Sequence, residues 1–315
     1  MSPQPTLSLI ERGPKAGELS VEQVWQQDGA SPVPAGARHL VPLELGGSLF
    51  LLAVDGTTGA VTALRVQSGE PWFEPVPSTL DLGGPWDVLD PFVIGNVPHL
   101  LAYAKEEGQF SFFPLGPDLT SRPPYQFRRI RPPGETAGFD TVKTMVVNGA
   151  VYYLCYSFDT GTVNIYSLAV TATSVPSAPE TPPLLSRPVW LHQWARSWTR
   201  FAFFQLGGAT FFLKTNVGRL NVNIDHVLDD PSQGTIEVGS YLQMDDALEV
   251  DLCRPFTLGH GDPYFVNYLT SGKTTFNRFH GDCLGWDTEA SVTTVPGATQ
   301  VVPLQVGDRC LVLFC

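Results

Sequence analysis

Apolar and polar residues follow one arrangement along this chain, and the arrangement recurs six times. Each copy opens with a short apolar run, passes through a turn rich in glycine or Asn-Gly, and continues into a second apolar run. Five copies then reach another glycine and a stretch of alternating polarity, such as GTVNIYSLA. Alternation with a period of two between glycine turns predicts β-strands joined by hairpins. No window favours a long amphipathic helix.

The copies begin at regular intervals. They open with ARHLVPLELGG, WDVLDPFVIGN, FDTVKTMVVNG, WTRFAFFQLGG, VDLCRPFTLGHG and ATQVVPLQVGD, at residues 37, 86, 139, 198, 250 and 298. The spacings are 49, 53, 59, 52 and 48 residues. A repeat of this length with several short strands is typical of β-propeller blades. We therefore predict an all-β, six-bladed β-propeller that forms a single domain over residues 1–315.

The last copy is incomplete, and the N-terminal segment supplies what it lacks. It stops at Phe314-Cys315, where the other copies reach their glycine turn and third strand. Residues 4–36 align with the second half of the preceding copy, and counting from Ala298 through the chain ends to Ala37 gives a spacing of 54. We predict that the sixth blade takes its inner strands from the C-terminus and its outer strands from the N-terminus. Such pairing removes the exposed edges of an open array.

Two positions in every copy are apolar and are predicted to pack between blades. The first contains Leu40, Leu89, Val142, Phe201, Cys253 and Val301. The second contains Leu43, Phe92, Met145, Phe204, Phe256 and Leu304. No set of polar residues recurs in the same way, which argues against one sugar site per blade.

Composition and charge exclude several classes of function. The net charge of -12 disfavours nucleic acid, because binding to phosphates depends on lysine and arginine. The N-terminus lacks the features of a signal peptide, and no apolar run approaches the roughly 20 residues of a membrane helix. We expect a soluble, cytoplasmic protein without membrane contact. The five cysteines form no CxxC pair and are expected to be reduced. No motif for a phosphate, a dinucleotide or zinc is present, so no cofactor is expected.

One repeat carries a resemblance to a known class of proteins. Residues 86–108 have the pattern W-x-x-x-x-PF-x-x-G, followed by xLLxY and a glycine turn. This pattern resembles the repeats of bacterial and fungal lectin-like β-propellers, and the likeness extends over nearly the whole chain. The resemblance implies the fold. It leaves the function open, because related propellers include sugar-binding proteins as well as hydrolases, lyases and cyclising enzymes.

Charged residues gather at the predicted starts of the innermost strands, which line the central channel of a propeller. Candidate catalytic residues for proton transfer are Asp87, Asp140, Asp251 and His39. Candidate ligand-binding charges are Arg38, Lys143, Arg200 and Arg254. Two alternatives stay open. The charges could form ion pairs between blades that plug the channel. The three aspartates could instead hold a hard cation, although the nearby arginines disfavour it, and we predict no metal.

The longest connection between copies is rich in tryptophan. Residues 169–200 begin with several prolines and end with Trp190, His192, Trp194 and Trp198. Large aromatic side chains on a loop often bind ligands, so a lid over the channel is expected to contain them. Trp198 and Trp86 occupy matching positions in the repeat and are further candidates for the pocket wall. The alternative is that these tryptophans belong to the blade cores.

Two functional hypotheses follow. In the first, the protein binds one small molecule in the central funnel and acts on it as a metal-independent cyclase, isomerase or lyase. In the second, it is a carbohydrate-binding lectin or an interaction scaffold with sites between blades. The absence of a repeated polar set favours the first hypothesis, and the resemblance to lectin-like repeats favours the second. The ligand is therefore predicted to be a small molecule or a glycan.

Overall fold

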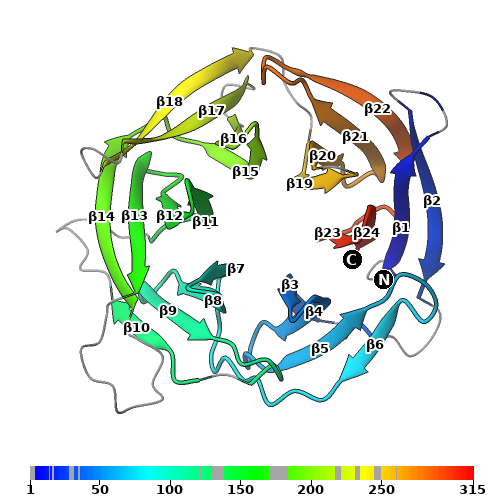
Figure 1. Cartoon of the computed structure of the whole chain (residues 1–315), viewed down its shortest axis with the longest axis horizontal. Coiled ribbons are helices and arrows are strands. Elements are labelled where there is room, and N and C mark those ends of the chain that lie inside the picture. The colour runs from blue at the N-terminus through cyan, green and yellow to red at the C-terminus, as the bar shows by residue number, and fades with distance from the viewer. Residues whose placement is uncertain are drawn as a thin grey trace.

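The chain forms a ring of six antiparallel sheets with four strands each (Figure 1). The computed structural model describes residues 4–13, 15, 18–27, 32–34, 36–120, 122–128, 138–170, 184–216, 221–230, 235–244, 250–259 and 261–315. These residues contain strands and turns and no helix, so no helix of membrane-spanning length occurs among them. The prediction of an all-β, six-bladed propeller is confirmed.

Four consecutive strands make up each of the first five blades. The first blade has β3 (Ala37–Leu45), β4 (Ser48–Asp55), β5 (Val61–Val66) and β6 (Phe73–Val76). The second has β7 (Val88–Ile94), β8 (Val97–Ala104), β9 (Gln109–Pro114) and β10 (Tyr125–Arg128). The third has β11 (Thr141–Val147), β12 (Ala150–Tyr156), β13 (Thr162–Val170) and β14 (Leu184–Gln193). The fourth has β15 (Trp198–Leu206), β16 (Ala209–Asn216), β17 (Asn221–Asp230) and β18 (Thr235–Met244). The fifth has β19 (Leu252–Leu258), β20 (Asp262–Tyr268), β21 (Lys273–Phe279) and β22 (Trp286–Thr293).

The sixth blade joins the two ends of the chain. Its strand order is β2-β1-β24-β23, with β1 (Thr6–Arg12), β2 (Leu19–Gln26), β23 (Val301–Val306) and β24 (Arg309–Phe314). The register between the ends runs from Thr6 opposite Phe314 to Ile10 opposite Cys310. The predicted closure is confirmed, and Figure 1 shows the blue and red strands side by side in one sheet.

Apolar side chains fill the spaces between blades. Six buried clusters lie one at each junction between neighbouring blades. All twelve residues of the two predicted apolar positions are at most 8% exposed. A blade therefore buries both faces only when it has two neighbours, which makes the ring the stable unit.

Tyrosines at the ends of three second strands fasten each blade to the next. Their hydroxyl groups accept backbone N–H bonds from the following blade: Tyr103 from Phe139 at 2.9 Å, Tyr156 from Trp198 at 3.2 Å and Tyr268 from Ala298 at 2.8 Å. These tyrosines are fully buried, so the bonds also satisfy hydroxyls that water cannot reach.

Glycine is required in the turns between the second and third strands. Gly161 has φ of 75°, and a Cβ there would lie 2.3 Å from the carbonyl oxygen of Trp194. Gly272 has φ of 92° and would meet the carbonyl oxygen of Thr294 at 2.6 Å. Only glycine fits such a conformation and approach. In the fourth copy of the repeat, the glycine that follows the second apolar run is Gly218, which lies outside the described residues. All five cysteines are free.

Candidate functional site

The first half of the six innermost strands encloses a central cavity of about 390 Å³. Residues from β3, β7, β11, β15, β19 and β23 all line it. Eleven of its seventeen lining residues are apolar. Its polar groups come from His39, Asp90, Lys143, Arg254 and Gln300, together with Thr144. Three residues of the predicted site, His39, Lys143 and Arg254, are therefore brought together in this cavity.

Asp90 and Lys143 form an ion pair between the second and third blades. The Oδ1 atom of Asp90 lies 2.5 Å from the Nζ atom of Lys143. Its Oδ2 atom accepts hydrogen bonds from the backbone N–H and the hydroxyl of Thr144, both at 2.6 Å. Asp90 is only 6% exposed, so these partners compensate its burial. The pair contributes no net charge to the cavity.

Arg254 supplies a positive charge that no carboxylate neutralises within bonding distance. Its Nη1 atom donates to the carbonyl oxygen of Cys253 at 2.9 Å, and this is its one hydrogen bond to the described residues. A guanidinium has five N–H donors, so most of them remain for a ligand or water. Burial lowers the pKa of Arg254, but an arginine starts so far above neutral pH that it stays charged. The cavity thus has a net positive charge, in a protein whose net charge is -12.

His39 is held as a neutral imidazole. Its Nε2 atom lies 2.7 Å from the carbonyl oxygen of Trp86, and because a carbonyl only accepts, Nε2 carries the proton. Burial is the main cause that lowers the pKa of His39, so the ring is uncharged at neutral pH. Its Nδ1 atom has a lone pair and no hydrogen bond to any described residue. His39 can therefore accept a proton or a hydrogen bond from a bound molecule.

Asp87, Asp140 and Asp251 lie at matching strand starts, but none lines the cavity. Each carboxylate accepts the backbone N–H at the beginning of the next turn of its own blade at 2.7 Å: Asp87 from Lys105, Asp140 from Phe158 and Asp251 from Thr270. The hydroxyl of Thr270 also donates to Asp251 and is the main reason why the pKa of that carboxyl is lowered. These hydrogen bonds favour the charged form of Asp251, which makes it a poor proton donor at neutral pH.

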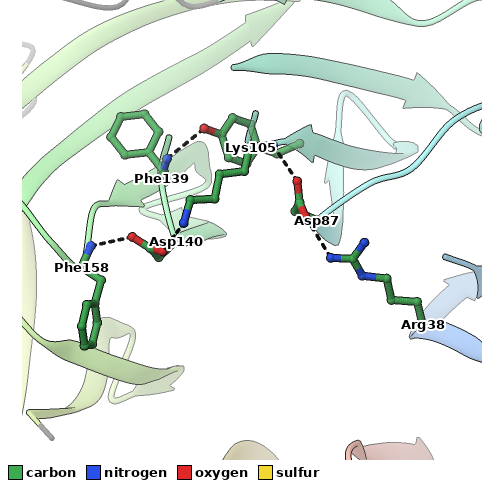
Figure 2. Close-up of polar contacts among 7 residues, drawn as sticks. Arg38, Asp87, Lys105, Phe139, Asp140 and Phe158 are labelled. Atoms are coloured by element: carbon green, nitrogen blue, oxygen red, sulfur yellow. Dashed lines mark hydrogen bonds and ion pairs between the residues drawn. The ribbon is translucent and has the colours of Figure 1, made fainter. Parts of the chain in front are cut away.

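Ion pairs link two of these aspartates, Asp87 and Asp140, to the neighbouring blades (Figure 2). Arg38 Nη2 lies 2.9 Å from Asp87 Oδ1, and Lys105 Nζ lies 2.6 Å from Asp140 Oδ1. This geometry corresponds to the alternative of ion pairs between blades, placed on the rim rather than inside the cavity. Arg200 has φ of 52° and donates to the Thr199 hydroxyl at 2.8 Å and to the Asp251 carbonyl oxygen at 3.1 Å.

The described part of the tryptophan-rich connection does not form a lid. Trp190 and His192 belong to β14, the outermost strand of the third blade, which pairs along its length with β13. Trp194 follows this strand and packs against Trp190, with ring centroids 6.0 Å apart. The expected lid is wrong because residues 184–193 complete the sheet instead of leaving it. Residues 171–183 of the connection lie outside the described part of the chain.

Trp86 and Trp198 are blade-core residues in the structure. Trp86 is 5% exposed, and its Nε1 donates to the carbonyl oxygen of Leu82 at 3.2 Å. Trp198 is 6% exposed and packs between the third and fourth blades. Neither lines the central cavity, so their placement agrees with the alternative of a structural role.

Sequence reasoning did not identify a set of prolines in the channel wall. Four innermost strands have proline at the same repeat position, namely Pro42, Pro91, Pro255 and Pro303. Thr144 and Phe203 occupy this position in the other two blades. The free edge of an innermost strand faces the channel, and a proline there leaves no unpaired N–H. The aligned repeats contain this signal, two residues after the first apolar position. Asp90 shares a repeat position with Lys143 and Arg254, but the sequence alone did not single it out as a site candidate.

Replacing Asp140 with alanine should destabilise the ring without affecting ligand binding in the channel. The change removes hydrogen bonds to the Phe158 N–H and to Lys105, and bonds to a charged group are worth about 1.5–3 kcal/mol. Chemical denaturation would measure the loss. Lys105→Met is the matched control, because it removes the partly exposed ion pair, worth about 1 kcal/mol or less, and keeps the bond between Asp140 and the Phe158 N–H. Loss of ligand binding at unchanged stability would instead assign Asp140 to the binding site.

Known proteins match this chain in fold. No protein-family model and no curated protein matches it. The solved structures that are similar include a provisionally assigned TolB from Agrobacterium tumefaciens, with 14% identity, a TM-score of 0.54, and coverage of 100% of this chain and 99% of that one. The SapL1 lectin in complex with alpha methyl fucoside has 11% identity, a TM-score of 0.51, and coverage of 88% and 87%. A provisionally assigned 6-phosphogluconolactonase from Bacteroides fragilis has 13% identity, a TM-score of 0.51, and coverage of 96% and 85%. Such identities show the propeller fold alone.

Proposed function

We propose that this protein binds one small anionic molecule per chain in its central channel. The observation that carries the proposal is the uncompensated charge of Arg254 in a cavity of about 390 Å³. Cavities of about 300–1,000 Å³, mostly apolar with a few polar groups, are typical of small-molecule sites. A positive charge inside a strongly acidic protein favours an anion at this one position.

Each polar group of the cavity would contact a different part of the ligand. Arg254 would form paired hydrogen bonds with the anionic group of the ligand, since its fork of donors matches a carboxylate. Lys143, held by Asp90, would offer its remaining donors to a second oxygen. The Nδ1 atom of His39 would accept a hydrogen bond from a ligand hydroxyl. Gln300 is already fixed by bonds to Leu40 and Ala37, so it supports the wall.

The finer hypothesis is a metal-independent cyclase, isomerase or lyase. If the protein is an enzyme of this kind, His39 is the preferred general base, because it is neutral, lines the cavity and has a free nitrogen. Asp87, Asp140 and Asp251 are less suitable, because each already accepts a turn N–H. Among the described residues, no three metal-ligating side chains lie close enough together to hold a metal ion.

A lectin or interaction scaffold with sites between blades remains the alternative. SapL1 was solved with alpha methyl fucoside, but a shared fold does not imply that this chain binds the same sugar. A lectin of this kind would bind several ligands per chain. The proposed channel site would bind one, so the stoichiometry separates the two functions.

The test is a thermal-shift screen of small carboxylates and phosphates, followed by calorimetric titration of the best binder. We expect a stoichiometry near one and a loss of affinity of about 10- to 100-fold in Arg254→Gln, because a bond to a charged group is worth about 1.5–3 kcal/mol. Arg187→Gln is the control, since Arg187 lies exposed on β14 at the outer rim. Unchanged affinity in Arg254→Gln, or several ligands per chain, would contradict the proposal.

A further inference from the structure

A second cavity of about 370 Å³ continues the channel toward the ends of the innermost strands. It shares four wall residues with the first cavity, namely Pro42, Phe203, Pro255 and Pro303. Beyond them its wall includes Leu49, Phe204 and Phe256. The two cavities therefore meet at the prolines. The first contains most of the charged residues, and the second, called the chamber below, is mainly apolar and opens to solvent at its rim.

The order of residues along a strand gives the depth of the apolar part. In β19, Arg254 is followed by Pro255, Phe256 and Thr257, and in β23 the corresponding residues end at Gln305. Thr257 and Gln305, with Glu44 and Gln205, give the second cavity a polar rim. At about 3.3 Å per residue, the distance along the strand from Arg254 to this rim is about 10 Å. Between the charge and the rim, the wall consists of prolines, phenylalanines and Leu49.

We propose that the natural ligand is a carboxylic acid with an apolar tail. The carboxylate binds Arg254, and the tail passes the prolines into the chamber lined by Phe203 and Phe256. This inference rests on the proposed function and names the class of molecule that the site takes. The apolar contact between the tail and the chamber adds to the contact between the carboxylate and Arg254.

The charges of the cavity select a single negative charge. Lys143 is neutralised by Asp90, so Arg254 is the one uncompensated charge among the described residues that line the first cavity, while Glu44 places a carboxylate on the rim of the second. A second negative charge on the ligand would find no second uncompensated cation among the described residues of the first cavity, and toward the rim of the second it would meet the Glu44 carboxylate. A monocarboxylate therefore fits better than a phosphate ester or a dicarboxylate.

The chemistry of the wall selects an apolar tail. Proline has no N–H, so the shared wall offers few donors to a ligand hydroxyl group. A polar group buried there would lose its bonds to water without replacement, whereas an alkyl or aryl group would gain from leaving water. A sugar, with hydroxyls on every side, is disfavoured at this position.

The experiment is calorimetric titration with acetate, butyrate, hexanoate and octanoate at one pH and ionic strength. We expect the affinity of the wild-type protein to rise about two- to fourfold with each methylene group that enters the chamber. Arg254→Gln should weaken every acid by a similar factor. Phe203→Thr should reduce the dependence on chain length, and it suits the strand because Thr144 occupies the same position in the third blade. Arg187→Gln again serves as the control.

The outcomes separate this inference from the proposed function. Equal affinity for acetate and octanoate, lost in Arg254→Gln, would overturn the apolar tail and leave the anion site intact. Binding of citrate but of no monocarboxylate, again dependent on Arg254, would have the same meaning. Octanoate binding that Arg254→Gln does not weaken would show attachment elsewhere and overturn the inference. Failure of every anion to bind would overturn both. The wild-type series alone decides the dependence on chain length, whatever the stability of Phe203→Thr.

Discussion

Deletion of residues 309–315 is expected to abolish the cooperative unfolding of the ring. The deletion removes β24, which pairs with β23 on one side and with β1 on the other. Residues 310–314 are at most 1% exposed, and burying a large apolar side chain stabilises a fold by about 1.5–3 kcal/mol. Their combined loss reaches the whole stability of an ordinary domain, about 5–15 kcal/mol. Circular dichroism and calorimetry on heating would measure the transition.

A single substitution that keeps β24 in place serves as the control for this deletion. Arg309→Gln removes only the exposed ion pair with Glu11, whose Oε1 atom lies 2.9 Å from the Arg309 Nε atom. Such a pair is worth about 1 kcal/mol or less, so the melting transition should remain sharp and close to that of the wild type. A truncated protein that still unfolds in one sharp transition near the wild-type temperature would show that the ring does not depend on β24.

The repeat made the fold predictable. Strand order, the closure and both apolar positions follow from residues that recur at matched places, such as Leu43 and Phe92, because each blade must bury the same two faces. The tyrosine at the end of the second strand also recurs, as in Tyr103 and Tyr156. The hydrogen bond between its hydroxyl and the next blade could not be predicted, because the sequence does not show which backbone N–H lacks a partner.

The candidate site was only partly predictable, because it depends on directions that the repeat does not encode. Asp87 and Arg254 both lie near the start of an innermost strand. The Asp87 carboxylate nevertheless accepts a backbone N–H from a turn of its own blade, whereas Arg254 lines the cavity. Trp190 was assigned to a lid because proline-rich segments usually form loops. In the structure, Trp190 instead lies in β14 opposite Ile165 of β13, so strand pairing outweighs the local preference of the prolines for a loop. The position of a residue in the repeat thus predicts its strand and how far along the channel it lies. The role of a charged side chain depends on the partner that it contacts, which the repeat does not specify.

A buried ion pair in the fourth blade was not predicted at all. Lys214 and Asp225 are 3% and 1% exposed and form a side-chain ion pair between β16 and β17. The Nζ atom of Lys214 also lies 3.6 Å from the ring centre of Trp194 and 4.6 Å from that of Trp198. Burial raises the pKa of Asp225 and lowers that of Lys214, so each depends on its partner to remain charged.

Asp225→Ala is therefore expected to destabilise the protein by about 3–5 kcal/mol, because it leaves the Lys214 ammonium buried without its counterion. Chemical denaturation at pH 7 would measure the change in the free energy of unfolding. The matched control is Glu74→Ala, which breaks an exposed ion pair with Arg65 and should cost about 1 kcal/mol or less. The double variant Lys214→Met, Asp225→Leu should recover most of the loss, since an apolar pair of similar volume carries no charge to desolvate. A loss of less than about 1 kcal/mol in Asp225→Ala, within the range of exposed ion pairs, would show that Lys214 reaches water or another acceptor.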